Sequence, residues 1–190
     1  PPVGLSITLD GVPLSVSSTF YAIHPNWTGR YYGYEDDRER MNRASVTRPE
    51  RNTTRVEIPM AGRTGEFEAK QTVEVGPGRT LRLTMDAHLT SGSGGLEHLV
   101  AGIFSGWISG RDYQVVFADG RSQTGLVPAF AKSPGLAEST LVRGFQSLRI
   151  DGRTGPIEIL TSGTTPVSLV DYRANKYADG RPIFWFGVLE

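Results

Sequence analysis

The feature that most constrains the fold of this chain is a set of short runs in which apolar and polar residues alternate. In one such run apolar side chains occupy every second position, at Leu81, Leu83, Met85, Ala87 and Leu89. A period of two places these residues on one face of a β-strand, whereas a helix needs a period near 3.6. Asp-Gly pairs, which favour tight turns because glycine tolerates a positive φ, begin at Asp10, Asp119, Asp151 and Asp179.

The pattern predicts an all-β protein, a single antiparallel β-sandwich such as a jelly roll over residues 1–190, with little helix. The predicted strands share alternation and turn-bounded ends, and span 3–9, 12–21, 54–60, 65–75, 79–90, 113–118, 122–127, 140–150, 156–161, 166–172 and 182–189. The segment Leu96–Phe104 fits either a strand or a short helix.

Composition excludes several classes of function. Lys plus Arg and Asp plus Glu each number 20, so the basic excess typical of a nucleic-acid partner is missing. Apolar runs stay well below the roughly 18 residues needed to cross a bilayer, so no membrane association is expected. With no cysteine, disulfides and cysteine nucleophiles are excluded.

The ends Pro1 and Phe184–Glu190 suggest a domain excised from a longer polypeptide, and the Arg-rich composition suggests a bacterial source.

One long connection, at about 22–52, breaks the strand pattern and collects aromatic and charged residues. Long loops in compact domains are usually functional or disordered, and large aromatics argue against disorder. Flat rings stack on the apolar faces of sugars, while arginine and carboxylates bind hydroxyl groups. The predicted carbohydrate-binding residues are Trp27, Tyr31, Tyr32, Tyr34, Arg30, Arg38, Asp36 and Asp37. The alternative is that the rings close one end of the sandwich.

Other chemistry has weaker support. His24, His88 and His98 lack metal-ligand spacing, so no metal or other cofactor is expected. The acidic run Glu35–Asp37 offers oxygen ligands for a structural Ca²⁺ but lacks the spacing of an EF-hand loop. The pair Glu66 and Glu68 is expected on a solvated face. No catalytic residue is predicted.

The strand order in the C-terminal half carries a family resemblance. Gly144–Gly152, Ile157–Leu160, Pro166–Arg173 and Phe184–Leu189 follow one another in this half. Together with the strands from Thr54 onward, this order resembles accessory β-sandwich domains found N-terminal to bacterial glycoside hydrolases, which are similar to half of the supersandwich of galactose-mutarotase-like proteins. The resemblance implies a sandwich that is not itself the hydrolytic centre, so it brings no catalytic residue with it.

We therefore predict a non-catalytic carbohydrate-binding module of a bacterial polysaccharide-degrading protein. Its expected partners are a polysaccharide or oligosaccharide and a catalytic domain of the same polypeptide, and its expected location is extracellular or periplasmic. Two alternatives stay open. One is a sandwich-fold polysaccharide lyase or glycoside hydrolase acting on an acidic glycan. The other is a structural or adhesive module that packs on a partner domain.

Overall fold

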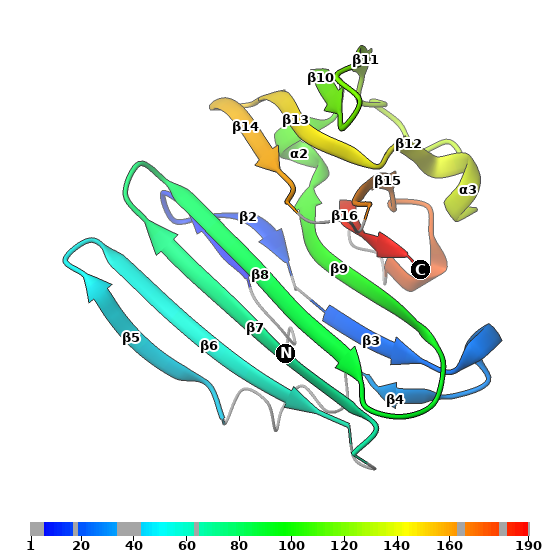
Figure 1. The fold of residues 1–190 in the computed structure, drawn as a ribbon. Helices are drawn as coiled ribbons and strands as arrows, with labels where there is room; N and C mark the ends of the chain where they lie inside the picture. Colours follow the sequence, from blue (N-terminus) through cyan, green and yellow to red (C-terminus); the bar gives the residue numbers. More distant parts are fainter. Residues whose placement is uncertain are drawn as a thin grey trace.

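The described residues of the protein form three antiparallel β-sheets (Figure 1). The computed structural model describes residues 6–16, 19–33, 43–62, 65–162, 166–178 and 182–189. Strands account for 61% and helices for 8%, which confirms the predicted all-β, sandwich-like fold with little helix. Within these ranges, no helix is both long enough and apolar enough to traverse a lipid bilayer.

The central sheet is eight-stranded and runs in the order β1-β2-β9-β16-β15-β12, with β3 also paired to β9 and β4 paired to β3. Its strands are β1 (Ile7–Leu9), β2 (Val12–Val16), β3 (Thr19–Ile23), β4 (Arg30–Tyr32), β9 (Gly95–Phe104), β12 (Thr140–Arg143), β15 (Ser168–Asp171) and β16 (Ile183–Leu189). Strand β9 joins the two halves of this sheet, because β2 and β3 both pair with it at successive positions.

Two four-stranded sheets accompany the central sheet. The hairpin sheet consists of β5 (Ser45–Glu50), β6 (Thr53–Ala61), β7 (Phe67–Gly76) and β8 (Thr80–Leu89). The upper sheet, in the order β11-β10-β13-β14, consists of β10 (Asp112–Phe117), β11 (Ser122–Leu126), β13 (Phe145–Gly152) and β14 (Gly155–Leu160). The short helices are η1 (Pro25–Trp27), α2 (Ser105–Ile108), α3 (Leu136–Ser139) and η3 (Lys176–Ala178).

Each four-stranded sheet has its own hydrophobic core against the central sheet. The upper core includes Phe184 and Phe186 of β16 with Leu148 and Ile150 of β13. The hairpin core contains Phe20, Ala22, Tyr32, Met60, Phe67 and Ala69. Burying side chains of this size contributes about 2 kcal/mol each, which is the main favourable term in forming a sandwich of sheets.

Both cores lie on the same face of the central sheet. Phe186 belongs to the upper core, and Gly187 lies on the other face of β16 because successive positions of a strand alternate. Gly187 is paired with position 99 of β9, so the neighbouring His98 faces the side of Phe186, and its ring lies 5.5 Å from that of Phe20 in the hairpin core. A register shift of β9 against β16, between Ala101 and Leu99, keeps the two cores on this common face.

The opposite face of the central sheet, called the back face below, carries Trp185. Its ring lies 5.5 Å from that of Tyr172, in the connection between β15 and β16, and only 2% of Trp185 is exposed. Phe184, Trp185 and Phe186 are consecutive and all buried, which requires cover on both faces of β16.

Several predicted boundaries are wrong in informative ways. The predicted strand 140–150 is two strands, β12 and β13, in different sheets, because Gly144 adopts a φ of +70° and turns the chain. The predicted loop at about 22–52 contains β4 and β5. The ambiguous segment Leu96–Phe104 lies in strand β9. Glu68 is exposed on the outer face of β7, as predicted.

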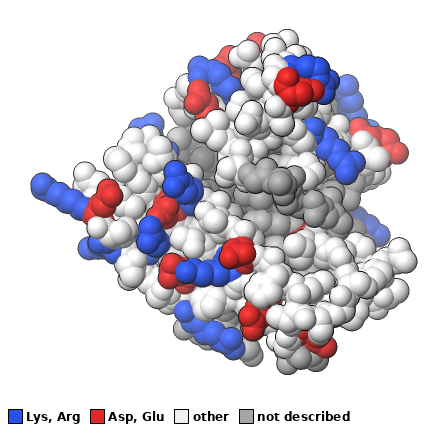
Figure 2. All heavy atoms as spheres, in the orientation of Figure 1, with Lys and Arg blue, Asp and Glu red and all other residues white. Residues whose placement is uncertain are grey.

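The outer face of the hairpin sheet is covered by paired charges (Figure 2). Arg55 pairs with Glu74, and Lys70 pairs with Glu57, at 2.6 and 2.9 Å. Residues on neighbouring strands thus alternate in sign, which is typical of a solvated sheet surface and concentrates no single charge.

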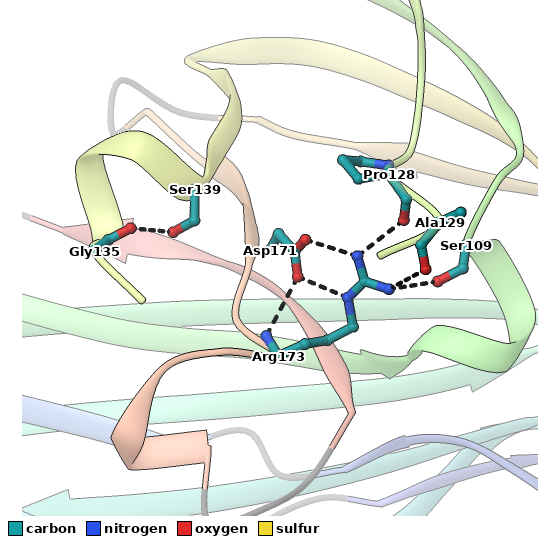
Figure 3. Close-up of polar contacts among 7 residues, drawn as sticks. All are labelled: Ser109, Pro128, Ala129, Gly135, Ser139, Asp171 and Arg173. Carbon is teal, nitrogen blue, oxygen red and sulfur yellow. Dashed lines mark hydrogen bonds and ion pairs between the residues drawn. The ribbon is translucent and has the colours of Figure 1, made fainter. Parts of the chain in front are cut away.

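One buried arginine ties the central sheet to the segment that follows the upper sheet's β11 (Figure 3). The Nε and Nη2 of Arg173 donate to the carboxylate of Asp171 at 2.8 and 2.7 Å. Its Nη1 donates to Ser109 Oγ and to the Ala129 carbonyl, and its Nη2 donates also to the Pro128 carbonyl. All five guanidinium N–H groups therefore have acceptors. The cluster has no spare donor for a ligand, so its role is structural.

We expect Arg173→Ala to lower the free energy of unfolding by about 3–5 kcal/mol, because it leaves the carboxylate of Asp171 buried without its counter-ion. Urea denaturation of the variant and the parent protein measures the difference. Arg121→Ala, which breaks an exposed ion pair with Asp119 at 2.6 Å, is the matched control and should change stability little. Equal losses in the two variants would contradict the structural role of Arg173.

Candidate functional site

The turn between β3 and β4 holds an exposed tryptophan in a strained conformation. Asn26 and Trp27 have φ values of +56° and +57°, a region that residues other than glycine seldom adopt. The turn is closed by a hydrogen bond from the backbone N–H of His24 to the carbonyl of Gly29, at 3.0 Å. Thr28 Oγ1 also donates to the carbonyl of Pro25. These bonds offset the strain and fix the backbone of the turn that presents Trp27, whose side chain is 57% exposed.

Tyr21 lies beside this tryptophan on the back face of the central sheet, and their rings are 6.1 Å apart, tilted by 50°. Glu97 on β9 is the direct partner of Tyr21, and Arg30 on β4 is the partner of Ile23, two residues further along β3, next to a register shift between the two strands. Strand pairing therefore places Tyr21, Glu97 and Arg30 on three neighbouring strands, beside the turn that holds Trp27. We call Tyr21, Trp27, Arg30 and Glu97 the back-face cluster.

The carboxyl group of Glu97 has unusual acid–base behaviour. Burial raises its pKa from an ordinary value of 4.5 to about 7, because the charged form loses hydration. Among the described residues, no basic side chain forms an ion pair with it. At neutral pH this group therefore exists in both protonation states, and it can donate or accept a hydrogen bond.

The structure separates the aromatic residues that the sequence places in one group. Tyr32 is only 1% exposed and packs in the hairpin core with its ring 5.4 Å from that of Phe67, so it cannot stack on a ligand. Tyr31 is half-buried, with its ring 4.1 Å from that of His24 and its hydroxyl donating to the carbonyl of Ser93. Of the described residues of the predicted set, Trp27 and Arg30 remain exposed.

Four predicted site residues, Tyr34, Asp36, Asp37 and Arg38, lie outside the described residues, as does the proposed calcium run Glu35–Asp37. In the described part of the chain, no three His, Asp or Glu side chains gather closely enough to hold a metal ion. His88 lies on the outer face of the hairpin sheet, 3.7 Å from Glu68, whereas His98 is buried beside Phe20. These histidines do not converge.

Tyr21 and Glu97 were not among the predicted site residues. Glu97 is the only acidic residue in the largely apolar run from Leu96 to Phe104, which is a visible signal. Its pairing with Tyr21 depends on the register of β3 against β9, and the sequence does not reveal that register. The other two tryptophans, Trp107 and Trp185, are both buried.

Comparison with protein-family models, with curated proteins and with solved structures found no match. The arrangement of side chains therefore carries the functional argument.

We expect stability to fall as pH rises from about 4.5 to 7, because the folded protein binds a proton on Glu97 that the unfolded chain releases. Below this window both states are protonated, and above it the cost of the buried charge is complete. Glu97→Gln should remove this contribution, gaining about 2 kcal/mol over the parent protein between pH 5 and 8 after allowance for partial exposure.

Urea denaturation of both proteins at several pH values measures the difference, and subtracting the parent's curve cancels all other titrating groups. Glu50→Gln, at an exposed position of β5, is the matched control and should show no such trend. A pH-independent difference between Glu97→Gln and the parent would contradict the raised pKa.

Proposed function

We propose that the protein is a non-catalytic carbohydrate-binding module that holds a sugar ring against Trp27 in the back-face cluster. The observation that carries the proposal is the exposed indole on a strained, hydrogen-bonded turn. Hiding a large apolar ring from water is ordinarily favourable, so a chain that presents one rigidly gains when a ligand covers it. The flat indole suits the apolar C–H face of a sugar ring.

The polar members of the cluster support the same ligand class. A sugar presents hydroxyl groups at its rim, which both donate and accept hydrogen bonds. Arg30 donates hydrogen bonds, and the carboxyl group of Glu97 at neutral pH can donate or accept one. The cluster carries one cation and one carboxyl group that is half ionised near pH 7, so it favours a neutral or mildly acidic glycan over a strongly charged ligand.

The parent protein that this proposal implies is a bacterial polysaccharide-degrading enzyme outside the cytoplasm. The sandwich-like fold agrees with the resemblance to accessory domains of glycoside hydrolases, in which another domain of the same polypeptide cleaves the glycan. In that arrangement the module holds the polysaccharide near the catalytic domain and raises its effective concentration there.

Glu97 favours a second candidate function, that of a lyase or hydrolase. A carboxyl group with a pKa of about 7 is matched to general acid–base catalysis near neutral pH. In a lyase, Tyr21 would abstract the proton and Arg30 would neutralise a uronate. A product assay on acidic glycans separates the two functions, because only an enzyme forms unsaturated or reducing ends. If the protein is such an enzyme, Glu97→Gln should abolish these products.

We expect Trp27→Ala to weaken glycan binding in affinity gels about fivefold while the melting temperature stays within a few degrees. The stacked ring is worth about 1 kcal/mol by analogy with aromatic pairs, which is a large share of a weak affinity. Tyr32→Ala should instead lower the melting temperature by many degrees, because it opens a cavity in the hairpin core.

Phe130→Ala is the matched control, since Phe130 is an aromatic residue that is 84% exposed at a different position. Its removal should leave retardation unchanged. The proposal fails if Trp27→Ala binds glycans as the parent does, or if no glycan in a broad panel retards the parent protein.

A further inference from the structure

The outer face of the upper sheet carries a group of polar side chains that the back-face cluster does not include. Tyr113 and Ile150 are buried, so their neighbours on β10 and β13 point outward. Register then places Gln114 between Thr124 of β11 and Arg149 of β13. The outward set is Asp112, Gln114, Thr124, Arg149 and Asp151.

These side chains line a groove. Its volume is about 420 Å³, and its lining also includes Tyr113 and Gly125. Pockets for small molecules span about 300–1,000 Å³, so the groove is large enough for a sugar unit. It lies on strands of a sheet, which hold side chains more precisely than loops do.

The groove has unused hydrogen-bonding capacity. Arg149 donates one hydrogen bond, from Nη1 to Glu158, and its Nε lies 3.9 Å from Asp151, too far for another. Within the described residues, the side chains of Asp112, Gln114 and Thr124 form no hydrogen bond. The contrast with Arg173 is direct, because every N–H of that guanidinium already has an acceptor.

The mixture of groups indicates the ligand. Two carboxylates accept, a guanidinium donates, and an amide and a hydroxyl do both. The two carboxylates repel an anionic ligand, and Arg149 disfavours a metal ion beside them. A neutral polyhydroxylated molecule uses donors and acceptors together at no charge cost.

We propose that this groove is a second saccharide site, which binds a neutral sugar by hydrogen bonds, separately from the stacking site at Trp27. The proposal rests on the proposed function for its ligand class but not for its residues. The residues of the two sites lie in different sheets, so a substitution in one site leaves the residues of the other in place.

The test is a titration of the ¹⁵N-labelled protein with neutral hexasaccharides of glucose, xylose and mannose, followed by amide chemical shifts. We expect shifts at residues 112–114, 124–125 and 149–151 that persist in Trp27→Ala. Asp151→Ala and Gln114→Ala should each weaken the groove affinity about tenfold, the effect of losing one hydrogen bond to a ligand. Asp86→Asn, at an exposed strand position on the hairpin sheet, is the matched control and should bind as the parent does.

The outcomes separate this proposal from the proposed function. Shifts around Trp27 alone would overturn the groove and leave the proposed function standing. Shifts in the groove alone would support the groove and overturn the Trp27 site. Groove shifts that appear only with CaCl₂ or with hexagalacturonate would overturn the neutral saccharide as its ligand, and no shifts with any probe would overturn both proposals.

Discussion

The rest of the structure depends on burying the central sheet on both faces along β16. Phe184 and Phe186 anchor the upper core, and Trp185 between them is covered from the back by the connection that carries Tyr172. A strand that is buried on both faces has a continuous run of apolar residues in its sequence, and Phe184–Phe186 is such a run. Strand β9 pairs with β16 from Glu97 to Phe104, and it also links the two cores, because Ile103 belongs to the upper core while Leu96 and the ring of His98 pack on the hairpin core. Disruption here would therefore affect both sheets that pack on it.

The same burial explains where the back-face cluster lies and why its carboxyl group is unusual. Along the back face, exposure rises from 2% at Trp185 to 57% at Trp27. Glu97 occupies the intermediate zone, where enough water is excluded to raise its pKa but a ligand still has access from the exposed end. The boundary of a core is a favourable place for recognition, since polar groups there are positioned by packing and are not fully satisfied by it.

Period-two alternation made β6, β7 and β8 of the hairpin sheet predictable to within about two residues, because β6 and β7 each alternate between a buried and a solvated face and β8 follows the same period. Strand β5 was missed, because all of its residues are exposed and its sequence shows no such alternation. The assembly of sites was not predictable, since it depends on register. Tyr31 and Tyr32 are adjacent, so a strand sends them to opposite sides, and strand β4 went unrecognised within a presumed loop. The groove draws on three strands up to 39 positions apart, as Asp112 and Asp151 show. Nothing local in the sequence marks such residues as neighbours.

The affinity expected of each surface bears on the kind of glycan that the proposed module would bind. One stacked indole contributes about 1 kcal/mol, and exposed hydrogen bonds add about as much each, whereas association itself costs several kcal/mol. A free monosaccharide should therefore bind weakly to either surface. A polysaccharide that reaches both would bind its second site intramolecularly, which raises avidity by factors of about 10²–10⁴ without a new contact. Two weak surfaces on separate sheets thus favour a long polymer over its short fragments, and they let a degrading enzyme release its products while holding its substrate.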